Sequence, residues 1–261
     1  ASKNREPPKF FFKKSLKKHQ FITLKNVFDP APRSHLKGTI MKNQFLFFLM
    51  AFLLISPTVS GQVFSFTTSE NGQSLEHRIL MDESYFVETQ FTTDPNNFAK
   101  TIGGFYKKRG NGLRVSLEFN SNFSKDSLKF VVIDNLDQWI KNSSDTLPLQ
   151  GKWLMAGRVK ENQERRRDTS RPRKTMKILI DGFFQWIAFN TATFSFHGSG
   201  GGRYNAENGT YTETIDFFSR DNNKAGISLE FEYTQKGLDW HHKGFSSKGD
   251  PLHEIWTFRT P

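Results

Sequence analysis

Residues 210–217 read TYTETIDF and alternate polar with apolar side chains, except that Glu213 stands in the apolar row. Residues 227–233 read ISLEFEY and alternate in the same way. An alternation of period two is typical of a β-strand that buries one face. The pair Asn208-Gly209 precedes the first run, and Asn-Gly favours the tight turn of a β-hairpin because it tolerates positive φ. The pattern predicts antiparallel strands here, and similar patterns without an amphipathic helix cover residues 61–261.

The last part of the chain contains enough strands for a barrel. Strand patterns begin near residues 152, 176, 183, 193, 209, 226, 238 and 253. Eight antiparallel strands close a barrel whose interior holds side chains or one small ligand. The arginine-rich residues 157–175 interrupt the spacing, and they have two interpretations: a solvated loop, or a cationic flap over the barrel mouth. The glycine run at 198–202 predicts a turn or a β-bulge, since a strand and not a helix follows it.

The chain also resembles itself at an offset of 98 or 99 positions. The matching segments occur in the same order: residues 78–82 with 177–181 (offset 99), 103–106 with 201–204, and 117–119 with 215–217 (both offset 98). A period of this length indicates two related domains rather than a solenoid. We therefore predict an all-β protein with two tandem related antiparallel β-barrels, at 61–148 and 149–261. The first copy lacks a clear last strand, and the sequence leaves open whether it closes.

The composition excludes several classes of protein. Hydrophobic residues make up 36% of the chain, which is enough for a packed core. There is no cysteine, so disulfides, thiolate metal sites and a cysteine nucleophile are excluded. The net charge is +11, but residues 1–60 carry 11 of the 37 Lys and Arg and only 2 of the 26 Asp and Glu. The rest of the chain is nearly neutral, and we expect no nucleic-acid partner.

Residues 41–60 have the pattern of a secretory signal peptide. A basic start precedes an apolar run at 45–55, and small residues follow it. We expect cleavage after Ser60 or Gly61 and a secreted or periplasmic protein, with a membrane contact only through this segment if it stays uncleaved. A single-span membrane anchor is the alternative, although the run is shorter than the roughly 20 residues that a spanning helix needs. Residues 1–40 are interpreted as a disordered basic segment upstream of a wrongly assigned start, with a nucleic-acid-binding arm as the rival interpretation.

A further pattern lies at the two ends of the second copy. Gly151-Lys152-Trp153 stands in its first strand and Arg259 in its last. Residues 149–261 resemble a lipocalin-like (calycin-type) domain of unknown function found in secreted bacterial proteins. The resemblance rests on these residues and on the segments 200–204, 211–218, 240–242 and 254–256. The resemblance implies a barrel that binds a small ligand, in which Arg259 packs over the indole of Trp153 and closes one end. It implies no established activity, and it extends to residues 62–148 only through the repeat.

The repeat also predicts an acidic residue inside the barrel. In the first copy Leu113, Val115, Leu117 and Phe119 share one face, and at an offset of 98 these positions hold Tyr211, Glu213, Ile215 and Phe217. Glu213 therefore takes the place of Val115 on an inward-facing row. Because a buried carboxylate must be hydrogen-bonded, ion-paired or protonated, Glu213 is interpreted either as a ligand contact or as a core residue satisfied by an inward Arg, Tyr or His.

The neighbours His241 and His242 point to opposite sides if they lie on a strand. If Trp240 packs inward, so does His242, and a Glu213–His242 pair could act as general acid and base or simply hold the core. No spacing of metal ligands emerges, so neither a metal nor another cofactor is expected. The predicted ligand-binding residues are Glu213, Tyr211, Trp186, Trp240 and His242, the predicted closure of the barrel consists of Trp153 and Arg259, and no catalytic residue is assigned.

These patterns predict a non-enzymatic protein that binds a small apolar or amphipathic molecule inside the second barrel. The first alternative is an envelope module that binds glycan or protein through surface aromatic residues. The second alternative is a hydrolase or isomerase that uses Glu213 and His242.

Overall fold

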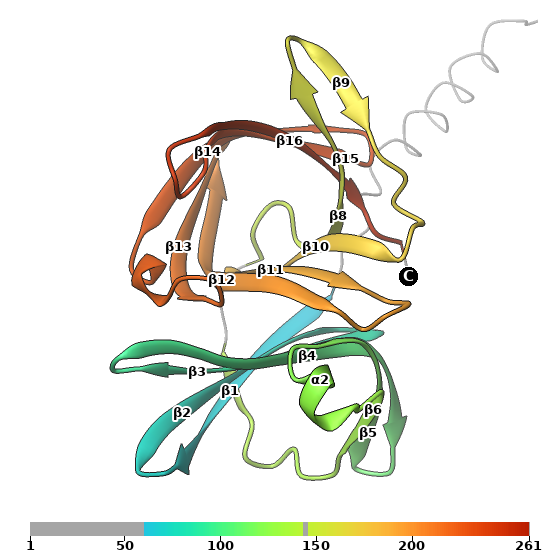
Figure 1. Ribbon diagram of the computed structural model, residues 1–261, viewed down its shortest axis with the longest axis vertical. Helices are drawn as coiled ribbons and strands as arrows, with labels where there is room; N and C mark the ends of the chain where they lie inside the picture. Colours follow the sequence, from blue (N-terminus) through green and yellow to red (C-terminus); the bar gives the residue numbers. More distant parts are fainter. Residues whose placement is uncertain (1–59, 143–145, 261) are drawn as a thin grey trace, which may run out of the picture. The chain divides into compact units, whose positions relative to one another are not determined.

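The computed structural model describes residues 60–142 and 146–260, and these residues fold mainly into β-strands (Figure 1). The prediction of an all-β protein is confirmed. The predicted basic segment (1–40) and all but the last residue of the predicted signal peptide (41–60) lie outside the described residues. In the part of the chain that is described, no helix has the length and apolar character needed to cross a membrane.

The first of two antiparallel sheets contains seven strands in the spatial order β6-β5-β4-β3-β2-β1-β7. Its strands are β1 (Gly61–Glu70), β2 (Gln73–Asp82), β3 (Tyr85–Thr93), β4 (Asn96–Arg109), β5 (Gly112–Asn120), β6 (Phe130–Ile133) and β7 (Ile140–Asn142). One helical turn, α2 (Phe123–Asp126), lies between β5 and β6. Among the described strands β6 and β7 form the edges, so this sheet is open.

The second sheet closes on itself as an eight-stranded barrel. Its order is β10-β11-β12-β13-β14-β15-β16-β8, and β8 pairs with β10 to complete the ring. The strands are β8 (Gly151–Lys160), β10 (Arg173–Ile180), β11 (Phe183–Asn190), β12 (Phe196–Glu207), β13 (Thr210–Phe218), β14 (Ser228–Lys236), β15 (Asp239–Phe245) and β16 (Pro251–Phe258), with a short 3₁₀ turn, η1 (Asn222–Lys224), after β13. The ninth strand, β9 (Gln163–Arg166), pairs only with the end of β8, so this hairpin extends beyond the barrel (Figure 1).

The barrel predicted for 149–261 is therefore present, whereas the described strands of 61–142 form an open sheet instead of the second barrel that we predicted. The two sheets have matching irregularities at an offset of 98. The β4–β5 ladder has a bulge at 103–104 and the β12–β13 ladder at 201–202. The β3–β4 ladder shifts at 90–91 and the β11–β12 ladder at 188–189. In the spatial order of the strands, although not at this offset, β7 and β1 take the places of β16 and β8, and no described strand of the first sheet takes the place of β15.

The bulges reverse the face of the residues that follow them. In β13, Glu213 lines the barrel interior, but Phe217 contacts Phe91 of the first sheet. In β5, Phe119 likewise packs between the two sheets. The prediction that Phe217 shares the face of Glu213, and Phe119 that of Val115, is wrong, because one extra residue in a bulged strand shifts the alternation by one.

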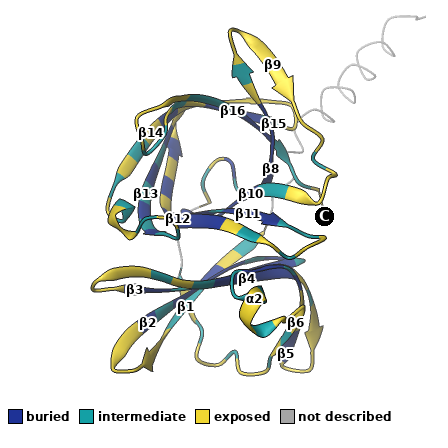
Figure 2. Cartoon of the chain, in the orientation of Figure 1, coloured by how far each residue is buried: buried dark blue, intermediate teal, exposed yellow. Residues whose placement is uncertain are grey.

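An apolar core joins the outer face of the barrel to the first sheet. Figure 2 shows that buried residues lie along the middle of the strands and exposed ones at the hairpin tips. The shared core consists of Val63, Leu80, Tyr85, Val87 and Phe119 from the first sheet and Leu154, Met176, Ile178, Ile180, Phe183, Ile187 and Phe189 from the barrel.

Two ion pairs border this core in a reciprocal arrangement. Arg78 of the first sheet donates to Asp216 of β13 at 2.6 Å. Arg259, which follows β16, donates to both carboxylate oxygens of Glu118 in β5 at 2.8 Å. Glu118 and Asp216 are matching positions at the offset of 98, so each sheet supplies an arginine to the other's carboxylate.

Candidate functional site

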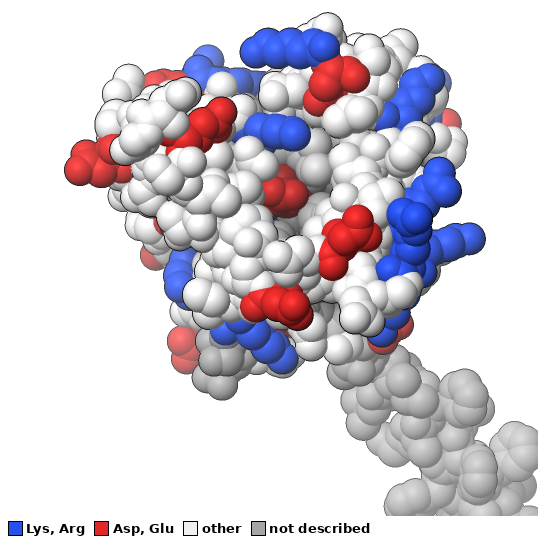
Figure 3. Space-filling view, turned by 90° about the horizontal axis from the view of Figure 1, so that it is seen from below, with Lys and Arg blue, Asp and Glu red and all other residues white. Residues whose placement is uncertain are grey.

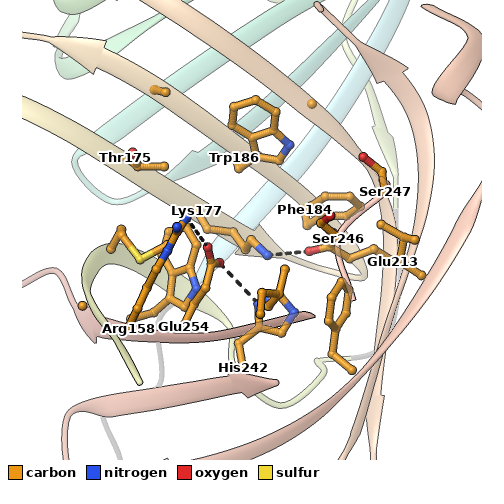
Figure 4. Close-up of a pocket in the computed structure, with 18 of the residues that line it drawn as sticks. Arg158, Thr175, Lys177, Phe184, Trp186, Glu213, His242, Ser246, Ser247 and Glu254 are labelled. Carbon is orange, nitrogen blue, oxygen red and sulfur yellow. Dashed lines mark hydrogen bonds and ion pairs between the residues drawn. The ribbon is translucent and has the colours of Figure 1, made fainter. Parts of the chain in front are cut away.

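A cavity of about 760 Å³ lies inside the barrel and is open to solvent at one end. Figure 4 shows side chains that line it. Inward-facing positions of β8 and β10–β16 build its wall. Ligand pockets in proteins range from about 300 to 1,000 Å³, so this cavity has room for a small molecule. Most of the interior wall is apolar or aromatic: Phe184, Trp186, Ile215, Phe218, Leu229, Phe231, Leu252 and Trp256.

Lys177 and Glu213 form a buried ion pair in this wall. Nζ of Lys177 lies 2.5 Å from Oε1 of Glu213, and both side chains are less than a tenth exposed. The hydroxyl of Tyr211 donates to the same carboxylate oxygen at 2.8 Å. Burial, and then the charge of Glu213, raises the pKa of Tyr211 well above its usual value, so the phenol keeps the proton that it donates. The carboxylate is thus satisfied on one oxygen by a cation and a neutral donor.

Aromatic rings surround the ammonium group of Lys177. The nitrogen lies 5.1–5.9 Å from the ring centroids of Phe184, Tyr211, Trp240 and Trp256. Ring faces attract a cation at this distance. The ion pair and the rings hold Lys177 in one position at the inner end of the cavity, where its charge is already compensated.

The two sheets can be compared position by position at the offset that their bulges share. The bulges fix the offset at 98, so Lys177 matches Ile79, and Glu213 matches Val115. Both first-sheet residues belong to an apolar cluster. The sequence comparison at offset 99 placed Arg78 opposite Lys177 and was wrong by one position, because Arg78 faces Asp216 and not the interior of its own sheet.

His242 and Glu254 lie opposite each other on β15 and β16. Nδ1 of His242 is 3.9 Å from Oε2 of Glu254, which is too long for a hydrogen bond. Arg158 donates to the other oxygen of Glu254 at 3.2 Å (Figure 4). Burial, and then the charge of Lys177, lowers the pKa of His242 well below its usual value, so the imidazole is neutral. Burial raises the pKa of Glu254, while Lys177 and Arg158 oppose that increase.

Several buried polar atoms have no hydrogen-bond partner among the described residues. They are both ring nitrogens of His242 and the indole nitrogens of Trp240 and Trp256. His242 is 2% exposed and lines the cavity together with Trp256. An unpaired buried donor or acceptor is unfavourable, and a neutral imidazole offers one of each. These nitrogens have almost no exposed surface, so the hydrogen-bonding capacity that the protein leaves unused lies in the core around the inner end of the cavity.

Basic side chains line the mouth of the cavity. They are Arg158, Lys160, Arg165, Arg167, Arg173 and Arg220. Residues 163–166 form strand β9, so the interpretation of 157–175 as a solvated loop is wrong for this part. The arginine-rich hairpin instead borders the opening.

Trp153 lies at the closed end of the barrel. Its indole nitrogen donates to the carbonyl of Leu149 at 2.8 Å, and its ring meets those of Trp240 and Phe258 edge-on. Leu149 is itself buried in the same cluster. The residues that precede β8 thus pack against Trp153 at this end of the barrel.

Arg259 does not pack over Trp153. Its guanidinium lies 5.2 Å from the ring centre of Tyr85 and 5.1 Å from that of Phe105, and it pairs with Glu118. Phe258, which pairs with Trp153 across the strands, faces the barrel interior. The next residue must face outward on an extended strand, so the predicted stacking of Arg259 on Trp153 is wrong.

Three of the five predicted ligand-binding residues line the cavity: Glu213, Trp186 and His242. Tyr211 and Trp240 are fully buried beneath the wall, where they support Lys177 and Glu213. The sequence analysis missed Lys177 and Glu254. A signal for Glu254 was available, since it shares a face with the inward Trp256 on an alternating strand.

Glu213 and His242 do not form the pair that the enzymatic alternative required. In the described structure Glu213 bonds to Lys177 and Tyr211, and the acid nearest to His242 is Glu254. His241 points away from the cavity toward His253, at 3.2 Å. No group of three His, Asp or Glu among the described residues has the geometry to hold a metal ion.

No protein-family model matches the chain, and a search of curated proteins finds no match. The function must therefore be inferred from the cavity itself.

Proposed function

We propose that the barrel binds one small, partly apolar molecule in its interior and performs no chemistry on it. The cavity of about 760 Å³ carries this proposal, because a barrel that serves only as a rigid scaffold needs a filled interior. The aromatic wall gives an apolar ligand a large contact surface.

We further infer that both sheets derive from one lipocalin-like unit. The bulges at matching positions and the matching strand order support a duplication, in which the first copy has lost the strand that would match β15. In this view the first sheet serves as a support for the barrel. The predicted signal peptide at 41–60 would place the protein outside the cytoplasm.

The envelope-module alternative depends on surface aromatic residues and not on the cavity. Phe130 and Phe245 are more than half exposed, but they lie on different sheets. The described surface therefore offers less support for a glycan platform than the barrel offers for a ligand.

The neutral dye N-phenylnaphthylamine tests the proposal because it fluoresces when it enters an apolar site. We expect saturable binding of one dye per chain. The variant Thr175→Trp places a large side chain in the cavity wall, and we expect it to weaken binding at least about tenfold. The control Thr67→Trp changes an exposed position of β1 and should bind like the wild type.

Circular dichroism and the melting temperature establish that both variants are folded. The absence of saturable binding to the wild type would contradict the proposal. Equal binding by wild type and a folded Thr175→Trp variant would also contradict it, since the dye would then bind elsewhere.

A further inference from the structure

The charges at the cavity mouth are unbalanced. Six basic side chains line the cavity near its opening, and the only acidic residues in its wall are Glu213 and Glu254. Lys177 neutralises Glu213, and Arg158 pairs with Glu254. Within the described part of the chain, the other five cations of the mouth form no ion pair: Lys160, Arg165, Arg167, Arg173 and Arg220.

These cations converge from separate segments of the barrel. Lys160 ends β8, Arg165 lies in β9, Arg173 begins β10, and Arg220 follows β13. Partial burial first, and then the neighbouring charges of Arg173 and Arg158, lowers the pKa of Arg167. Partial burial and Arg220 lower the pKa of Arg173 in the same way. Like charges held this close create a positive potential at the opening that favours an anion.

The described chain as a whole has no comparable excess of positive charge. Residues 61–261 are close to neutral in total. On the face seen in Figure 3, basic and acidic side chains are interspersed. The positive mouth is therefore a local feature of the barrel and not a consequence of overall charge.

The cavity wall farther in from the mouth is suited to the uncharged part of a ligand. Trp186 and Phe218 meet edge-on near the opening, and Arg220 lies 5.3 Å from the ring centre of Trp186. Phe231 and Leu252 line the cavity farther along. An acidic group would be disfavoured at the inner end, because Lys177 is already paired and Glu254 would repel it.

We propose that the ligand is an amphipathic organic anion, whose apolar or aromatic body lies in the barrel and whose acidic group lies at the mouth among Arg167, Arg173 and Arg220. This inference rests on the ligand-binding function proposed above and adds the chemical class of the ligand. The acid can be a carboxylate, sulfonate or phosphate, since guanidinium groups bind all of these through charge-assisted hydrogen bonds.

A matched pair of dyes tests the charge requirement in the full chain. Anilinonaphthalene sulfonate has the same aromatic body as N-phenylnaphthylamine and adds one negative charge. We expect the sulfonate to bind about tenfold more tightly at low ionic strength, and we expect this preference to shrink as salt is added.

The double variant Arg167→Gln/Arg173→Gln should remove most of the preference for the sulfonate and leave the affinity for the neutral dye unchanged. The double variant Arg109→Gln/Arg114→Gln loses the same charge from exposed positions of the first sheet and should keep the preference. Sodium sulfate, which has charge but no apolar body, should displace the sulfonate dye no better than sodium chloride of equal ionic strength.

The outcomes separate the two proposals. Failure of the neutral dye to bind refutes the ligand-binding function itself. Binding of both dyes with equal affinity, or a preference that survives in the folded Arg167→Gln/Arg173→Gln variant, refutes only the anionic class. Specific displacement by sulfate would show a site for bare anions and would likewise refute an amphipathic ligand.

Discussion

At the scale of single residues, the buried pair of Lys177 and Glu213 is the most demanding feature of the barrel. Two charges have been removed from water where the matching positions of the first sheet hold Ile79 and Val115. An apolar pair is therefore sufficient for folding in this kind of sheet. The polar pair shapes the inner wall of the cavity at a cost in desolvation.

The single variant Glu213→Gln should destabilise the protein by about 3–5 kcal/mol, because it leaves the ammonium of Lys177 buried without a counter-charge. The triple variant Lys177→Met/Glu213→Leu/Tyr211→Phe keeps similar volumes and removes every polar group of the cluster. Its free energy of unfolding, measured with urea, should return to within about 1 kcal/mol of the wild type or exceed it. A triple variant as unstable as Glu213→Gln would show that the loss of stability does not come from an uncompensated charge on Lys177.

The neutral imidazole of His242 makes stability depend on pH. In the unfolded chain its pKa is close to 6.5, and in the folded protein burial and Lys177 lower it well below that value. The unfolded state therefore binds a proton that the folded state does not, and stability falls as the pH decreases below about 6.5.

The variant His242→Phe should lose stability less steeply than the wild type as the pH falls from about 6.5. The difference in slope should be at most about 1.4 kcal/mol per pH unit, the effect of one proton. Urea denaturation at a series of pH values measures it, with Lys177 and Glu254 as the charged groups facing the ring. Parallel curves for the two proteins would mean that His242 does not titrate as described.

Sequence reasoning located Glu213 because a carboxylate interrupted an apolar row that the repeat predicted to face inward. It missed Lys177 because a lysine flanked by apolar residues on a short strand resembles an exposed position. It placed Tyr211 and Trp240 at the cavity surface, but pattern alone gives the direction of a side chain and not its depth. The role predicted for Arg259 was wrong because it was taken from the family resemblance. The alternation of the last strand turns Arg259 away from Trp153.

At the scale of elements, the strand pattern predicted most of the barrel. Each of the eight predicted starts lies within three residues of a barrel strand. Strand β9 was missed because QERR has no apolar face. Its backbone pairs with β8, and Arg166 donates to Asp239 of β15. The glycine run at 198–202 predicted a turn or a bulge, and the β12–β13 ladder shifts at 201–202. The extra residues of β13 and β5 were missed because the alternation itself does not show them.

Glycines make the matching bulges possible. A Cβ on Gly202 would lie 1.9 Å from the carbonyl oxygen of Thr214, and a Cβ on Gly104 would lie 1.9 Å from that of Ser116. Because backbone atoms cannot rotate away, we expect Gly202→Ala and Gly104→Ala each to destabilise the protein by at least about 3 kcal/mol. Gly110→Ala, at a turn with φ of +56° and open space around it, should lose only about 1 kcal/mol. Similar losses of stability for all three variants, measured by urea denaturation, would contradict the requirement for glycine at the two bulges.

At the scale of the whole molecule, the core shared by the two sheets should make them unfold together. Phe119 is completely buried in this core and contacts Phe189 of the barrel. The variant Phe119→Ala should lose about 3–5 kcal/mol. Hydrogen exchange followed by mass spectrometry in increasing urea should show the same midpoint for peptides of β4–β5 and of β12–β13, in the wild type and in the variant. Two separate midpoints would show that the halves are independent domains.

The central claim is that the barrel is a container for one amphipathic organic anion. Native mass spectrometry of the full-length protein, isolated from its own source without denaturants, tests this claim most directly. We predict a complex with one added molecule per chain, which is released on unfolding and is detected as a negative ion with an apolar body. A chain that carries no added mass, and that also fails to bind either naphthalene dye, would contradict the account.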